Sequence, residues 1–181
     1  MSQNRLRPAS RFTHHVSRIT DHVSITIMPL DSDQETLEFI RSHRVARLAT
    51  TSANRQPSVI PVCFVLDGER IYTPIDEKPK SVDASSLKRV KNILANPNVA
   101  LLVDDYSEDW SMLIYVLISG TAELLSPGDD ASEHIRVVEL LRQKYSQYRA
   151  MAINERPIIK ITPFRIKRWP AREKHPADTN R

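Results

Sequence analysis

The stretch SVIPVCFVLDGERIYTP, residues 58–74, holds the strongest fold signal in the chain. Its first half is apolar enough for a well-buried strand, which the pattern predicts over residues 58–65. Asp67 and Gly68 follow, and this pair readily adopts the positive φ angles of a tight hairpin turn. A second strand is predicted over residues 70–74. The stretch therefore predicts a β-hairpin within a larger sheet.

Further apolar segments on both sides of this hairpin also have the pattern of strands. They are residues 45–51, 99–104, 113–125, 158–162 and 164–169. Gly120 is expected to form a bulge or bend. Most neighbouring strands are joined too tightly for a helical crossover, so the sheet should be largely antiparallel. The expected fold is mainly β (α+β), a six- to seven-stranded antiparallel β-barrel with two or three flanking helices.

Polar residues before apolar stripes predict where the helices begin. The capping-box pattern SDQE at residues 32–35 predicts a helix that ends near residue 43. A serine at position 85 or 86 is expected to cap a second helix. Ser126 and Pro127 match the N-cap and first position of a third helix.

Length and charge indicate one soluble domain with a basic N-terminal segment. The chain has 181 residues and a net charge of +4, and residues 1–27 hold four arginines against one aspartate. Residues 1–27 are predicted to be a disordered leader, residues 28–169 the compact domain, and residues 170–181 a loose tail. A nucleic-acid-binding role for the leader is the less favoured alternative. No apolar run suggests a membrane span or secretory signal, so a cytoplasmic location is predicted.

The few glycines restrict how this protein can bind a phosphate group. Its three glycines lie too far apart for a P-loop or a GxGxxG turn, so cationic side chains must do the binding. Lys78 and Lys80 follow the predicted strand, and Lys88 and Arg89 fall in the first turn of the next helix. Thr73 could add a hydroxyl group. The alternative is that these cations are ordinary solvated side chains.

Other polar groups are weaker candidates for a site. The acidic run at residues 104–109 lacks the glycine and spacing of a calcium loop and is expected to be a solvated connection. His43 and His134 are isolated, and Cys63 lies in an apolar run and is expected in the core. There is no nucleophile elbow and no metal-ligand cluster. Redox chemistry here would therefore depend on a bound cofactor.

Several short motifs, in their order and spacing, point to a known family. They are the Pro-x-x-Phe pattern ending at Phe64, the Asp-Gly hairpin, the Lys-Pro-Lys loop, the Asn-Pro-x-Val step at residues 96–99, and Asp109-Trp110. From about Leu37 to Trp169 the chain resembles the pyridoxamine 5′-phosphate oxidase-like flavin/deazaflavin split-barrel family. Within it, the chain is most similar to the branch assigned to the deazaflavin coenzyme F420.

This resemblance implies a homodimer with two cofactor sites at the subunit interface. It implies that basic residues and a hydroxyl group bind the cofactor phosphate, that the second strand supports the ring, and that a partner's aromatic residue lines the substrate pocket. The corresponding residues are Lys78, Lys80, Lys88, Arg89 and Thr73 for the phosphate, Val59, Ile60 and Pro61 for the ring, and Trp110 for the pocket, with Arg89 and Lys80 ranked highest.

The implied function is an F420-dependent oxidoreductase that transfers a hydride between the reduced deazaflavin and a small organic acceptor. An FMN-dependent enzyme of the same fold is the nearest alternative. The positive charge around residues 78–89 leans towards F420, because that coenzyme carries an acidic tail. A different alternative is a binding module for a flavin-like cofactor or haem, for which His43 and His134 are the obvious axial ligands.

Overall fold

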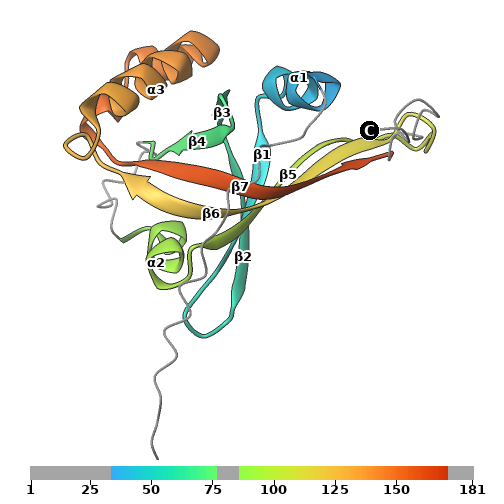
Figure 1. Ribbon diagram of the computed structural model, residues 1–181, viewed down its shortest axis with the longest axis horizontal. Coiled ribbons are helices and arrows are strands. Elements are labelled where there is room, and N and C mark those ends of the chain that lie inside the picture. The colour runs from blue at the N-terminus through green and yellow to red at the C-terminus, as the bar shows by residue number, and fades with distance from the viewer. Residues whose placement is uncertain (1–33, 77–85, 171–181) are drawn as a thin grey trace, which may run out of the picture.

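The computed structural model describes residues 34–76 and 86–170 (Figure 1). Three α-helices lie in this part of the chain: α1 (Gln34–Ser42), α2 (Lys88–Ala95) and α3 (Ala131–Lys144). Two short 3₁₀ helices, η2 (Ser146–Arg149) and η3 (Ile153–Glu155), follow α3. None of the described helices is both long and apolar enough to cross a membrane. The predictions for the leader and the tail fall outside the described residues.

The strands form one seven-stranded sheet in the order β2-β1-β5-β6-β7-β4-β3. Every neighbouring pair is antiparallel. The strands are β1 (Ala46–Thr51), β2 (Pro57–Val62), β3 (Val65–Asp67), β4 (Arg70–Pro74), β5 (Asn98–Asp105), β6 (Ile114–Leu125) and β7 (Ile158–Trp169). The predicted α+β fold with a seven-stranded antiparallel sheet and flanking helices is therefore confirmed.

The sheet curls because its two edge strands are neighbours in the sequence. β2 and β3 stand at opposite ends of the strand order, yet only Cys63 and Phe64 separate them. The sheet must bend round so that this short link can join its edges, which makes the half-barrel seen in Figure 1.

The single strand predicted over residues 58–65 was wrong, because the structure divides it at Phe64. The Phe64 N–H donates to the hydroxyl of Tyr145, 3.0 Å away, and that hydroxyl lies 2.7 Å from the Phe64 carbonyl oxygen. A distant side chain therefore satisfies backbone groups that would otherwise pair with a strand. The chain turns from one sheet edge to the other at this point.

The two strands predicted over residues 158–162 and 164–169 are in fact one strand, β7. The ladder between β6 and β7 shifts register between Ser119 and Gly120, where Gly120 stands opposite Pro163. This irregularity confirms the bulge predicted at Gly120, and it lets β7 continue through a proline that cannot donate to the ladder.

Two clusters of buried apolar side chains hold the sheet and helices together. The first fills the barrel, where α1 contributes Ile40 and α2 contributes Val90 and Ile93. The second lies between α3 and the outer side of β3 and β4. Cys63, which was expected in the core, is only half-buried and packs against this second cluster.

The predicted serine caps of the last two helices were wrong. α2 begins after Leu87, which makes no side-chain capping bond. α3 begins after Asp130, whose carboxylate accepts from the Glu133 N–H at 2.9 Å. Asp129 accepts from the N–H of Ser126 at 2.7 Å, so the residues after Ser126 form a turn instead of helix.

Candidate functional site

The first turn of α2 carries the two described cations of the predicted phosphate site. Lys88 is exposed, whereas the Arg89 side chain is only 14% exposed. A terminal nitrogen of Arg89 lies 3.7 Å from a carboxylate oxygen of Asp76, just beyond the end of β4. That separation allows an ion pair but is longer than a normal hydrogen bond.

Arg89 has capacity to bind a further acceptor. Its Nε atom is buried and has no hydrogen-bond partner within residues 34–76 and 86–170. Burial lowers the pKa of the Arg89 guanidinium, while the nearby Asp76 carboxylate and Tyr148 act in the opposite direction. A buried guanidinium with an unused donor is under-satisfied, because a guanidinium offers five N–H donors and each buried donor needs an acceptor.

Thr73 lies in the barrel wall instead of on an open surface. It is 1% exposed on β4, where it stands opposite Ile159 of β7. Strand alternation puts it on the same face of the sheet as Ile71, in the first cluster. Lys78 and Lys80 lie outside the described residues, so the structure places three of the five predicted phosphate ligands.

A buried hydrogen bond fixes α2 against β1, the strand that pairs with the predicted ring site on β2. The Asn92 side-chain amide of α2 donates to the Thr50 hydroxyl of β1 at 2.9 Å. Thr50 stands opposite Ser58 of β2, directly before Val59. The same helix therefore carries Arg89 at its start and is held against β1, the strand that pairs with β2, about one turn later.

Strand alternation divides the three predicted ring contacts on β2. Val59 is 62% exposed and Pro61 is also exposed, so both face outward. Ile60 between them is half-buried and packs against the first cluster. Val59 and Pro61 thus share one surface, and Ile60 supports it from behind.

The outward surface of β2 continues across four more strands as one sheet face, which we call the open face. In register with Val59 lie Ala49, Ala100, Ser119 and Arg165. The next outward row includes Leu117, which is 36% exposed and belongs to neither apolar cluster.

The open face ends in an aromatic pair. Tyr115 of β6 and Trp169 of β7 are neighbours in register, and their rings lie 6.4 Å apart at 12°. Trp169 is 48% exposed. Small side chains at the centre and aromatic ones at one end make this face suitable for covering by another surface.

Trp110 does not meet the α2 site within one chain. It is 78% exposed in the connection between β5 and β6, where Asp109 accepts bonds from Ser111. Those bonds lower the pKa of the Asp109 carboxyl group. This connection lies near Trp169, at the end of β7. Asp76 lies near the start of β7, because Pro74, two residues before it, pairs with Ile158. The two predicted parts of the site lie at opposite ends of the same long strand.

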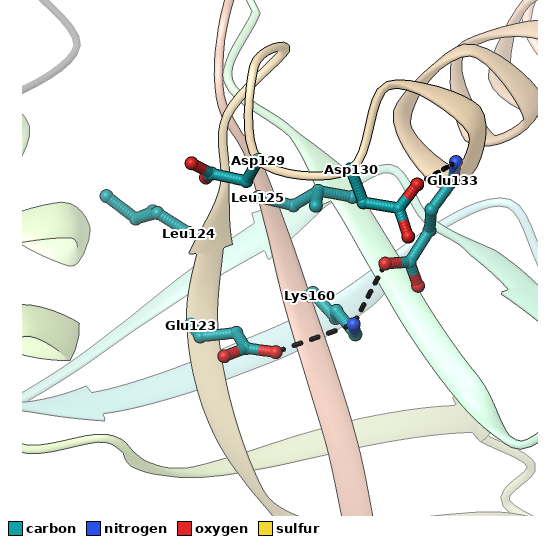
Figure 2. Close-up of a pocket in the computed structure, with 7 residues that line it drawn as sticks. All are labelled: Glu123, Leu124, Leu125, Asp129, Asp130, Glu133 and Lys160. Carbon is teal, nitrogen blue, oxygen red and sulfur yellow. Dashed lines mark hydrogen bonds and ion pairs between the residues drawn. The ribbon is translucent and has the colours of Figure 1, made fainter.

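A separate cleft of about 320 Å³ lies between the start of α3 and strands β6 and β7 (Figure 2). Lys160 bridges Glu133 at 2.9 Å and Glu123 at 3.5 Å. Glu133 also accepts from the Tyr72 hydroxyl at 2.5 Å. Burial alone raises the pKa of Glu133, but the bonds from Tyr72 and Lys160 outweigh it and lower that pKa. These side chains satisfy one another's charges and hydrogen bonds, so we interpret them as a network that stabilises the fold.

Asp76, Asn92 and Thr50 were not among the residues predicted from the sequence. Asp76 precedes the lysine stretch directly, and an acid beside predicted phosphate ligands was a signal that could have been noticed. Nothing in the local sequence marks the Asn92–Thr50 pair, because the two residues are 42 positions apart and meet only through the fold.

Comparisons with known proteins agree with this architecture. The family model described as pyridoxamine 5′-phosphate oxidase matches residues 32–170. A curated relative, the 5a,11a-dehydrotetracycline/5a,11a-dehydrooxytetracycline reductase of Streptomyces rimosus, is 32% identical over 96 residues. That match covers 52% of this chain and 65% of the relative, slightly less than two thirds of its length.

Two solved structures share the fold but differ in the group that their names report. The haem storage protein HutZ of Vibrio cholerae has a TM-score of 0.59 and 15% identity, and the match covers 77% of this chain and 94% of HutZ. An FAD-binding protein of Mesorhizobium loti has a TM-score of 0.57 and 19% identity, with 76% of this chain and 93% of that protein covered. The fold alone therefore does not specify a cofactor.

Proposed function

The chain belongs to the pyridoxamine 5′-phosphate oxidase family, and from this premise we propose that it is an oxidoreductase that binds the phosphate of coenzyme F420 at the start of α2. The observation that carries the proposal is the buried Arg89 guanidinium with an unused Nε donor. A phosphate oxygen would supply the missing acceptor. Lys88, and Lys78 and Lys80 from the sequence prediction, would add positive charge.

The other parts of the site would position the ring and exclude water. Val59 and Pro61 offer an outward apolar surface on β2, and Thr73 contributes to the barrel wall behind the phosphate end. When bound, reduced F420 supplies a hydride to the acceptor. The chain would orient that acceptor against the ring, and a conjugated organic molecule is proposed because the curated relative is named as a reductase of dehydrotetracyclines.

We propose that the protein works as a homodimer. The open face, with exposed Val59, Leu117 and Trp169, is the surface that a second copy would cover. Since Trp110 lies far from Arg89 in one chain, Trp110 of one subunit would reach the cofactor site of the other. This arrangement would complete the substrate pocket.

The haem-binding alternative is less well supported by the described histidines. His134 is 2% exposed, and its Nε2 atom lies 2.9 Å from the Arg156 carbonyl oxygen. The His43 ring nitrogens lie 2.7 Å from the Phe39 carbonyl oxygen and 3.0 Å from Asp105. Both side chains have protein partners, so axial ligation would require those bonds to break.

Cofactor titration tests the proposal. Purified protein is titrated with F420 and with FMN while quenching of cofactor fluorescence is followed. The Arg89→Ala variant should bind F420 at least about tenfold more weakly, because a hydrogen bond to a charged group contributes roughly 1.5–3 kcal/mol. The matched control is Lys91→Ala, an exposed cation on the same helix, which should bind as the wild type does.

Three outcomes would change the conclusion. Tighter binding of FMN than of F420 would move the enzyme to the flavin alternative and keep the phosphate site. Wild-type affinity in Arg89→Ala would remove α2 from the site. Binding of neither cofactor would contradict the proposed function.

A further inference from the structure

Asp76 is a carboxylate inside the proposed phosphate site, which is an unusual place for a negative charge. Its side chain is 26% exposed, and its oxygen lies 3.7 Å from the Arg89 guanidinium. A phosphate that reaches Arg89 must approach this carboxylate as well. Like charges at such separations repel by an energy proportional to the product of the two charges.

Groups on two elements, α2 and η2, interact with Asp76. Arg89 faces it from α2, and Tyr148 approaches from η2. Burial raises the pKa of Tyr148, and the Asp76 charge adds to this effect, so this tyrosine is neutral near pH 7. Among the described residues, the Arg89 guanidinium and the Asp76 carboxylate are therefore the two charges that an ion pair brings together at the start of α2.

The two candidate cofactors present different phosphate charges to this site. The FMN phosphate is a monoester whose second ionisation has a pKa near 6, so it carries about two negative charges at pH 8. The F420 phosphate is a diester, since the acidic tail is attached to it, and it carries one negative charge at any pH near neutrality. A nearby carboxylate disfavours the doubly charged group more strongly.

We propose that Asp76 is a specificity-determining residue that favours a singly charged phosphodiester over a doubly charged phosphomonoester at the start of α2. This inference rests on the proposed function, because it requires a phosphate bound beside Arg89. It goes further by assigning the choice between deazaflavin and flavin cofactors to one carboxylate that the sequence did not single out.

The test compares wild type with Asp76→Asn, a near-isosteric change that removes the charge. Dissociation constants for F420 and FMN are measured by fluorescence quenching at pH 8 and pH 5.5. The repulsion energy between Asp76 and the phosphate doubles when the phosphate charge doubles, so the fold-change in the dissociation constant is squared. If Asp76→Asn strengthens F420 binding about threefold, it should therefore strengthen FMN binding about tenfold at pH 8. At pH 5.5 the FMN gain should fall towards threefold, while the F420 gain stays unchanged.

Asp67→Asn is the matched control. Asp67 is 28% exposed and pairs with Arg136, a similar environment on another part of the surface. This variant should leave both affinities and their pH dependence as in the wild type. A general effect of losing an aspartate–arginine pair would appear in both variants.

The possible failures are distinguishable. Equal gains for the two cofactors at both pH values, or weaker binding in Asp76→Asn, would overturn the specificity role while the effect of Arg89→Ala still supported the phosphate site. Wild-type affinity in Arg89→Ala, or no binding of either cofactor to the wild type, would overturn the proposed function and this inference with it.

Discussion

Lys144 is a lysine whose charged form is disfavoured by burial. Lys144, in the last turn of α3, holds its ammonium group 4.4 Å above the centre of the Phe64 ring. Burial, helped by nearby Arg44, lowers the pKa of Lys144 to about 8. The attraction between the cation and the aromatic ring favours the charged form, but the cost of desolvation is larger.

We expect the Lys144→Met variant to be more stable than the wild type at pH 7, with a gap that narrows at pH 9.5. The unfolded chain holds the lysine proton up to about its ordinary pKa of 10.5, whereas the folded protein releases it near 8. Between these values the unfolded state binds more protons, so wild-type stability rises with pH. Urea unfolding at the two pH values measures the gap.

The control for this experiment is Lys91→Met, which changes an exposed lysine on α2. Its difference from the wild type should not depend on pH in this range. A gap for Lys144→Met that stays constant between pH 7 and pH 9.5 would show that the folded protein keeps Lys144 charged.

The β1–β2 turn shows how strand pairing fixes the backbone conformation of a single residue. The turn between β1 and β2 lacks glycine. Its left-handed position, with a positive φ of 60°, is taken by Arg55, whose N–H donates to the Ser52 carbonyl oxygen at 2.8 Å. The pairing of Thr51 with Pro57 sets the length of the turn and therefore which residue takes this conformation.

Gly120 should be required by the β6–β7 pairing. A β-carbon added there would lie 2.7 Å from the Thr162 carbonyl oxygen and 3.2 Å from the Pro163 α-carbon. These backbone atoms cannot move without disturbing the ladder. Gly120→Ala should therefore destabilise the protein by about 1–3 kcal/mol, as overpacked sites generally do.

Chemical unfolding of Gly120→Ala beside Gly128→Ala measures this effect. Gly128 lies in the turn before α3, and a β-carbon there would have no neighbour within 4 Å. The control should unfold close to the wild-type midpoint. Equal stability of the two variants would mean that the bulge tolerates a side chain.

At the scale of the whole molecule, the open face predicts that two chains form a homodimer. A dimer would have about twice the chain mass of 20.7 kDa. Leu117→Glu should give a monomer, because it would place a charge at the centre of the surface that a second copy is proposed to cover. Size-exclusion chromatography with light scattering measures the mass.

Ile135→Glu is the control, since Ile135 is 68% exposed on α3 and lies outside the open face. It should remain a dimer. A monomeric wild-type protein at micromolar concentration would contradict the homodimer and would leave Trp110 without a route to the cofactor site.

Much of the fold could be predicted because strand periodicity and turn chemistry are local. The Asp-Gly hairpin, the bulge at Gly120 and the antiparallel arrangement each follow from residues close together in the chain, and the structure confirms them. The basic start of α2 was found in the same way. It stays a predicted phosphate site, supported by the under-satisfied Arg89.

Long-range contacts decided the rest. Tyr145 divides a predicted strand at Phe64, 81 positions away, and Asn92 reaches Thr50 across 42 positions. Asp76 becomes a partner of Arg89 only when α2 packs beside the end of β4. Such pairs depend on which elements the core brings together, because side-chain bonds and ion pairs act over a few ångströms and have no local sequence pattern.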